Sequence, residues 1–143
     1  MSEDSQTRLH DLLADGRLGT LATIKRDGRP QLSNVSYHYD RDNATILVSI
    51  TDSRAKTKNL RRDPRATFHV TGTDGWTYAV AEGTATLSEV TREPGDAASD
   101  ELVEVFRRIG GEHPDWQEYR EAMIDEERLV LRLAVERVYG MPG

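Results

Sequence analysis

Residues 52–65 read Asp-Ser-Arg-Ala-Lys-Thr-Lys-Asn-Leu-Arg-Arg-Asp-Pro-Arg, and the rest of the chain is organised around this stretch. We predict one short helix here, because Asp52 or Ser53 can cap its start and Pro64 limits its end. The stretch carries six of the chain's 19 basic residues, although the net charge of the whole chain is −6. The basic patch is therefore a local feature of an acidic protein.

The direction of these charges along the predicted helix indicates an anion site. Arg54 and Lys56 lie in the first turn, where the helix dipole makes a cation unfavourable by a few tenths to about 1 kcal/mol. An anion bound there would be held by the free backbone N–H groups, by the dipole and by both cations. Charge alone does not separate this interpretation from an ordinary solvated basic face.

The composition predicts a single folded domain over residues 1–143. Hydrophobic residues make up 36% and charged residues 31% of the chain, which is typical of a soluble globular protein. No apolar run approaches the roughly 20 residues of a membrane helix, and the first residues show no signal-peptide pattern. The absence of cysteine excludes disulfides and cysteine-based metal sites. We therefore expect a cytoplasmic protein with no membrane partner, and the acidic balance argues against general nucleic-acid binding.

The pattern along the chain predicts a mainly β protein with peripheral helices. Alternating apolar residues, β-branched residues and tight turns indicate about six strands, at 17–25, 30–39, 45–50, 66–71, 76–87 and 128–135. Besides the basic helix, we predict a helix at 7–14, a second one capped by Asp100 and a third that begins at Pro114. Antiparallel strands in this number have to hide their edges, so we expect a small barrel in which the second and third strands are neighbours.

One face of the predicted strand 76–87 carries unusually small side chains. The residues on that face are Ala79, Ala81, Gly83 and Ala85. Such a row leaves room for the close approach of a helix, a neighbouring strand or a ligand. Close packing inside a tight barrel is the commoner cause.

No catalytic group of side chains is evident in the sequence. The four histidines lie in separate predicted elements without metal-ligand spacing, so we expect no metal site. There is no Gly-x-Ser-x-Gly, P-loop or dinucleotide-binding glycine motif, and the catalytic residues stay unassigned. An enzyme without an obvious nucleophile or acid–base pair usually takes its chemistry from a cofactor.

Small polar side chains interrupt two predicted strands close to the basic helix. They are Gln31, Ser33 and Asn34 on the second strand and Ser49 on the third. If the two strands are neighbours, these side chains can line one groove with Arg54 and Lys56, as a polar wall beside an anion clamp. The alternative is a solvent-facing strand, which spacing alone favours.

Several segments together resemble a known group of proteins. Residues 19–35, 53–66 and 74–83, supported by 113–120 and 138–140, are similar to the flavin and deazaflavin oxidoreductases of the split β-barrel superfamily, which includes pyridoxamine 5′-phosphate oxidase. The similarity is greatest to the actinobacterial branch that uses the deazaflavin coenzyme F420. The resemblance implies a six-stranded antiparallel split β-barrel that works as a homodimer with two cofactor sites at the interface. It also implies hydride transfer from reduced F420 to an electron-poor small organic acceptor.

The resemblance further implies roles for particular residues. Arg54 and Lys56 would hold the phosphate of the coenzyme, while Thr57 and Asn59 would help to bind its linker. The residues implied to lie at the deazaflavin ring are Gln31, Leu32, Ser33, Asn34, Ser49 and Ala55. Those implied to come from the partner subunit are Trp76, Tyr78 and Ala79. Arg120 or Arg128 would meet the oligoglutamate tail of the coenzyme.

Three other functions stay open at this point. The first is an FMN-dependent enzyme of the pyridoxamine 5′-phosphate oxidase type, since FMN also joins a tricyclic ring to a phosphate. The second is a protein that binds F420 or haem without catalysis. The third is nucleic-acid binding through the basic helix, which the lack of interleaved aromatic residues near that helix disfavours.

Overall fold

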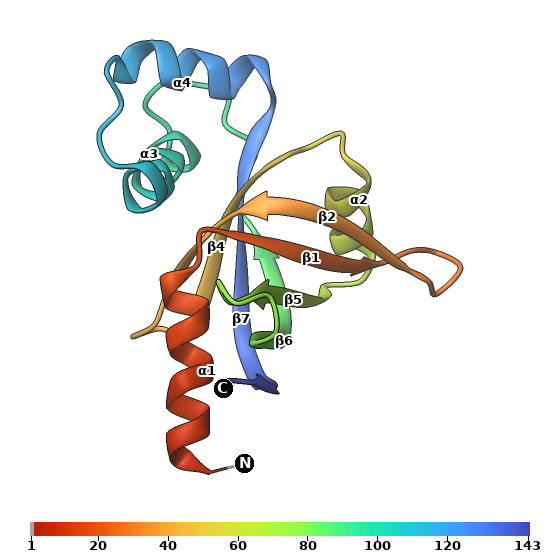
Figure 1. Ribbon diagram of the computed structural model, residues 1–143. Coiled ribbons are helices and arrows are strands. Elements are labelled where there is room, and N and C mark those ends of the chain that lie inside the picture. The colour runs from red at the N-terminus through yellow and green to blue at the C-terminus, as the bar shows by residue number, and fades with distance from the viewer. Residues whose placement is uncertain (1) are drawn as a thin grey trace.

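Seven antiparallel strands form one curled sheet in the computed structural model, which describes residues 2–143 (Figure 1). The strands are β1 Leu18–Ile24, β2 Pro30–Ser36, β3 His38–Asp40, β4 Thr45–Thr51, β5 Arg65–Thr71, β6 Tyr78–Leu87 and β7 Arg128–Met141. Their order in the sheet is β2-β1-β5-β6-β7-β4-β3. The curled sheet makes a half-barrel, and the predicted fold class, a mainly β split barrel with peripheral helices, is confirmed.

The predicted strand 30–39 is two strands, β2 and β3, separated by Tyr37. The side chain of Tyr37 is 1% exposed, and its hydroxyl donates a hydrogen bond to the carbonyl oxygen of Leu13 at 2.6 Å. The chain changes direction at this buried anchor, so the structure has seven strands where the sequence indicated about six.

Only the end of the second predicted strand, now β3, is hydrogen-bonded to the third, so the expected pairing is corrected for its longer part, β2. β2 pairs with β1, whereas β4 pairs with β3 and β7. β2 and β3 lie at opposite ends of the sheet order, although only Tyr37 separates them along the chain. The sheet therefore has to curl until its ends meet, and β2 comes into contact with β4 at this opening.

Four helices accompany the sheet: α1 Glu3–Asp15, α2 Ala55–Arg62, α3 Ala97–Gly110 and α4 Trp116–Asp125. α1 lies at the end of the barrel near both termini, and it buries Leu9 and Leu13 in the main core (Figure 1). α3 and α4 lie side by side at the opposite end, where they form a second apolar cluster with Val130 of β7. α2 connects β4 to β5 beside the edge formed by β2.

Two predicted helix caps are wrong, and α4 begins at Trp116 with Asp115 as its cap rather than at Pro114. α2 begins after Arg54, which occupies the N-cap position without a side-chain hydrogen bond to the first turn. Asp52, one of the two predicted caps, forms an ion pair with Arg61 instead, at 2.8 Å. α3 is capped by Asp96 rather than by Asp100, because the Asp96 carboxylate accepts a hydrogen bond from the backbone N–H of Ser99 at 2.7 Å.

Other bounds shift for local reasons. α1 begins at Glu3, since the Ser2 hydroxyl caps its first turn. β6 begins at Tyr78 and leaves Trp76 in the preceding turn, where the Asp74 carboxylate accepts from the Trp76 backbone N–H at 2.9 Å. β7 continues to Met141, because it pairs with β6 over residues 131–141, well beyond the residues 128–134 that pair with β4.

The small side chains of β6 are explained by close packing inside the half-barrel. Ala79, Ala81 and Ala85 are all buried in the main core. Gly83 lies at a register shift between β6 and β7, where an added Cβ would stand 1.9 Å from the carbonyl oxygen of Ala134. A neighbouring strand, and not a ligand, therefore occupies the space that these residues leave.

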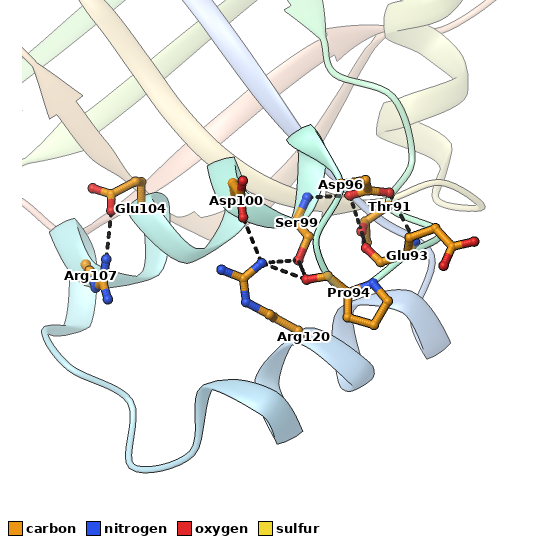
Figure 2. A network of polar contacts seen from close by, with 9 residues as sticks. All are labelled: Thr91, Glu93, Pro94, Asp96, Ser99, Asp100, Glu104, Arg107 and Arg120. Atoms are coloured by element: carbon orange, nitrogen blue, oxygen red, sulfur yellow. Dashed lines mark hydrogen bonds and ion pairs between the residues drawn. The ribbon is translucent and has the colours of Figure 1, made fainter.

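The Asp96 carboxylate organises the loop that leads into α3 (Figure 2). It accepts hydrogen bonds from the backbone N–H groups of Arg92 and Ser99, at 2.8 and 2.7 Å, and from the Thr91 hydroxyl at 2.8 Å. Burial raises the pKa of Asp96, but these hydrogen bonds to the charged form outweigh it and hold the pKa at about 2. The ionised carboxylate thus stabilises the folded state.

We expect Asp96→Ala to lower the free energy of unfolding by about 1–2 kcal/mol, the usual cost of losing a helix cap. In the wild type, this contribution is complete above the ordinary aspartate pKa of 3.8 and is lost as the pH falls toward about 2. Urea denaturation at pH 7 and pH 3 measures both effects. The control is Asp100→Ala, which removes only the surface ion pair with Arg120 and is expected to cost less than about 1 kcal/mol. Equal losses for the two variants would contradict the assignment of Asp96 as the cap.

Candidate functional site

A groove of about 890 Å³ lies between the opening of the half-barrel and the α3–α4 pair. One wall comes from β2, from β4 and from the start of α2, and the other comes from α3, α4 and the residues that follow them. Seven residues that the sequence analysis assigned to a cofactor site line this groove: Gln31, Ser33, Asn34, Ser49, Arg54, Ala55 and Lys56. The expected groove therefore exists, although β2 and β4 form it by meeting across the opening rather than by pairing.

Two cations without a carboxylate partner lie at the start of α2. In the described part of the chain, neither Arg54 nor Lys56 forms an ion pair, and the Nζ of Lys56 donates to the Ser33 hydroxyl at 3.2 Å. Burial, followed by the nearby charges of Arg54 and Arg128, lowers the pKa of Lys56. Because Arg128 already pairs with Glu126 at 2.9 Å, the surplus positive charge is that of Arg54 and Lys56. An anion at this place would relieve it.

A chain of hydrogen bonds fixes the side chain of Gln31 at the polar edge of the groove. The amide of Asn59 donates to the Thr23 hydroxyl at 3.1 Å, and that hydroxyl donates to the Gln31 side-chain oxygen at 2.8 Å. Asn59 and Thr23 are buried, so this arrangement is held from inside the protein. Thr57 is buried too, and its hydroxyl donates to the Thr51 carbonyl oxygen at 2.7 Å, which ties α2 to the end of β4.

Most of the other predicted site residues lie outside the groove. Thr57 and Asn59 support it from the core, whereas Leu32 is 62% exposed and does not line it. Tyr78 stacks on His69 with ring centroids 5.6 Å apart, and Ala79 is buried in the main core. The side chain of Trp76 is 82% exposed. The contacts of Trp76, Tyr78 and Ala79 with the cofactor of a partner subunit stay a prediction.

The second wall of the groove was missed in the sequence analysis. Its residues include Phe106 and Ile109 of α3, His113 of the connection, and Tyr119 and Met123 of α4. The sequence shows these residues as two amphipathic helices, and nothing local indicates that part of their apolar surface faces the basic helix about fifty residues earlier in the chain. Only the tertiary arrangement brings the two walls together.

Polar contacts join α3 to α4 and hold α3 against the sheet, in addition to the apolar cluster. The Tyr119 hydroxyl donates to the Leu102 carbonyl oxygen at 3.0 Å, and burial raises the Tyr119 pKa to about 12. The guanidinium of Arg132 on β7 pairs with Glu101 of α3. Both contacts fix the apolar wall in position over the polar one.

The two arginines predicted for the oligoglutamate tail have different surroundings. Arg128 lines the groove. Arg120 instead points to the start of α3, where it donates to the Pro94 carbonyl oxygen at 2.7 Å and pairs with Asp100 at 2.9 Å (Figure 2). In this structure Arg120 joins α4 to the loop before α3 and is not part of the groove.

Residues 2–143 contain no cluster of three or more histidine or acidic side chains that could hold a metal ion. Within the same residues, none of the helices is both long enough and apolar enough to cross a lipid bilayer.

A comparison with protein families identifies the fold. A family model described as pyridoxamine 5′-phosphate oxidase matches residues 6–142, almost the whole chain. The chain belongs to the pyridoxamine 5′-phosphate oxidase family. This membership confirms the family resemblance seen in the sequence, and it agrees with the half-barrel of antiparallel strands.

Several solved structures are similar in fold to this pyridoxamine 5′-phosphate oxidase family protein. A conserved hypothetical protein from Mycobacterium tuberculosis is 28% identical, with a TM-score of 0.73 over 99% of this chain and 84% of that chain. A protein described as an F420 reductase is 19% identical, with a TM-score of 0.67 over 91% of this chain and 94% of that one. A haem-binding protein from Mycobacterium smegmatis is 21% identical, with a TM-score of 0.71 over 100% of this chain and 56% of that one. At such identities the last two show a shared fold alone.

Proposed function

We propose that this protein is an oxidoreductase whose groove binds a phosphorylated tricyclic redox cofactor, coenzyme F420 in preference to FMN. It transfers a hydride from the reduced coenzyme to an electron-poor small organic acceptor. The observation that carries this proposal is the pair Arg54 and Lys56, two cations without a carboxylate partner at the start of α2, beside the polar edge of β2. The family membership and the fold shared with an F420 reductase support it.

The residues of the groove fit such a cofactor. Its volume of about 890 Å³ lies within the range of about 300–1,000 Å³ that is typical of small-molecule sites. The free N–H groups at the start of α2, together with Arg54 and Lys56, suit a phosphate. Gln31 and Ser33 offer hydrogen bonds to the polar edge of a heteroaromatic ring, and the apolar wall of α3 and α4 lies across the groove from them.

The chain itself contributes position and electrostatics. When bound, the reduced deazaflavin supplies the hydride, and the acceptor has to lie within reach of its reactive carbon. The polar wall fixes one edge of the ring through Gln31, whose orientation Asn59 and Thr23 set from the core. The apolar wall excludes water from the remaining space, which strengthens the electrostatic interactions inside it.

Equilibrium binding to the cofactor-free protein tests this function. We expect F420 to bind more tightly than FMN and haem, and the loaded protein to oxidise reduced F420 when electron-poor acceptors are added. Tighter binding of FMN would make FMN the cofactor in place of F420. The second candidate function is a haem carrier, which the fold shared with a haem-binding protein and the place of His113 in the groove favour. Tight haem binding without affinity for F420 would favour this function over the enzyme.

We also propose that the protein is a homodimer through one exposed face of its sheet. Directly paired residues share a face of a sheet, and the pairs Leu32–Ala22, Val80–Tyr139 and Tyr78–Met141 place large apolar side chains on the same outer face. Leu32, Tyr139 and Met141 are 62%, 39% and 56% exposed. Trp76 precedes β6 and is 82% exposed. Several exposed apolar side chains on one face of a sheet favour an interaction surface there.

We expect the wild type to sediment as a dimer and Trp76→Asp to weaken the dimer at least about tenfold, because buried tryptophans dominate many interfaces. Sedimentation velocity over a range of protein concentrations measures the dissociation constant of the dimer. The control is Glu121→Ala on the exposed surface of α4, which should leave the dimer unchanged. A monomeric wild type would contradict the proposed interface.

A further inference from the structure

The two walls of the groove differ in chemistry. The wall of β2, β4 and α2 is polar and cationic, whereas the wall of α3 and α4 presents Phe106, Ile109, Ala122 and Met123. If a polar tricyclic ring occupies the first wall, as the proposed function requires, the second wall is left for the acceptor. Its aromatic, aliphatic and thioether groups favour a flat apolar molecule.

One polar group interrupts the apolar wall. His113 lies in the connection between α3 and α4 and lines the groove. The backbone N–H of Asp115 donates to its Nδ1 at 2.9 Å. A neutral imidazole that accepts at Nδ1 carries its proton at Nε2, so the free ring nitrogen of His113 is a donor.

The orientation of the His113 ring is fixed by its neighbours. Its centroid lies 5.2 Å from that of Phe106, 5.6 Å from that of Trp116 and 5.5 Å from that of Tyr119. Trp116 is itself held, because its indole N–H donates to Glu112 at 3.0 Å and the Arg107 guanidinium lies 4.9 Å from its ring centroid. Within residues 2–143, Nε2 of His113 makes no hydrogen bond.

We propose that the α3–α4 wall binds a flat, apolar acceptor that carries one hydrogen-bond-accepting atom, and that the Nε2–H of His113 donates to this atom. His113 thereby sets which end of the acceptor enters the groove, and it draws electron density toward the accepting atom. This inference rests on the proposed function only in naming the bound molecule as the acceptor of the hydride. The binding preference itself is a property of His113 and the apolar wall.

Quinoline and naphthalene test the preference, because they have the same shape and only quinoline carries an accepting nitrogen. With the full-length protein, we expect ligand-observed NMR to show quinoline binding about tenfold more tightly than naphthalene, the value of one net hydrogen bond. In His113→Phe, quinoline and naphthalene should bind about equally well, and naphthalene should still bind. His113→Gln keeps a donor and should keep most of the preference. Equal affinities in the wild type, no binding of either compound, or an unchanged preference in His113→Phe would overturn the proposal.

The imidazole signals of His113 give a readout that does not depend on affinity. Two-dimensional ¹H–¹⁵N spectra of the ring should show the tautomer protonated at Nε2, and its signals should shift with quinoline more than with naphthalene. Protonation at Nδ1 would contradict the donor role.

F420 binding to the same variants separates this inference from the proposed function. If F420 binds in a Lys56-dependent way but the quinoline preference is absent, only the inference on His113 fails. If the preference is present and F420 does not bind, the proposed cofactor fails and the His113 subsite stands.

Discussion

Lys56→Ala lowers the affinity for F420 by about 10- to 100-fold, within the 1–3 kcal/mol of a charge-assisted hydrogen bond to a phosphate. The effect is expected to be large because Lys56 is half-buried, has no carboxylate partner among residues 2–143 and lies beside Arg54 at the start of α2. Isothermal titration calorimetry or fluorescence quenching with the cofactor-free protein measures the dissociation constant for F420. The wild-type affinity should also fall with rising salt concentration, since the contact is between charges.

Lys58→Ala is the matched control for this prediction. It removes the same charge from the same helix, but Lys58 is exposed and does not line the groove. We expect its affinity to stay within about twofold of the wild type, because exposed charges contribute little. A deazaflavin that lacks the phosphate should bind the wild type and Lys56→Ala equally well. Equal loss in the two variants, or loss with the phosphate-free compound, would contradict the phosphate role of Lys56.

The pH dependence of binding follows from the same charge. Burial and the neighbouring Arg54 and Arg128 lower the pKa of Lys56 below its ordinary value of 10.5. A bound phosphate favours the charged amine and raises this pKa again, so the wild-type affinity for F420 should fall as the pH rises through the lowered pKa. Lys56→Ala should not show this loss over the same pH range.

Gly83→Ala is expected to lower the free energy of unfolding by about 3 kcal/mol, at the upper end of the cost of overpacking a core. Its Cβ would meet the backbone of Ala134, with the carbonyl oxygen at 1.9 Å and the carbonyl carbon at 2.8 Å. Backbone atoms of the paired strand β7 can move aside only by disturbing the register shift at this position. The melting temperature should fall by roughly 10 °C, to judge from domains of similar size.

Gly95→Ala is the control for Gly83→Ala, because it adds the same methyl group where no heavy atom lies within 4 Å. We expect its stability to stay within about 0.5 kcal/mol of the wild type, as for most surface substitutions. Urea denaturation of the two variants side by side makes the comparison. If Gly83→Ala were as stable as Gly95→Ala, the close approach of β6 and β7 described above would be wrong.

Local signals were enough to predict most of the elements but not how they pair. The alternation in β1 and the Asp27-Gly28 turn mark a hairpin, and Gly28 has the positive φ of 88° that such a turn needs. No comparable signal shows that β7 lies between β6 and β4, because this pairing joins residues far apart in the sequence. The break at Tyr37 was missed for the same reason, since its hydroxyl is bound by the distant Leu13.

The residues of the candidate site likewise divide into those that the sequence could predict and those that it could not. Arg54 and Lys56 could be predicted to line the groove because their charges oppose the dipole of their own helix, which is a property of adjacent residues. Gln31 and Ser33 could be predicted because polar residues interrupt their strand. The apolar wall could not, since Phe106 looks like an ordinary member of an amphipathic helix, and His113 like part of a connection, until α3 and α4 are placed over the barrel opening. The choice of Asp96 over Asp100 as a cap likewise depends on a loop conformation that the sequence does not specify.

A crystal structure of the protein with F420 tests the central claim most directly. We predict that the phosphate lies at the start of α2, with its oxygens at hydrogen-bonding distance, about 2.7–3.2 Å, from the side chains of Arg54 and Lys56. The deazaflavin ring should lie along the polar edge of β2, with α3 and α4 across the groove. A phosphate bound elsewhere, or a groove filled by the protein's own side chains while the coenzyme binds at another place, would contradict the account.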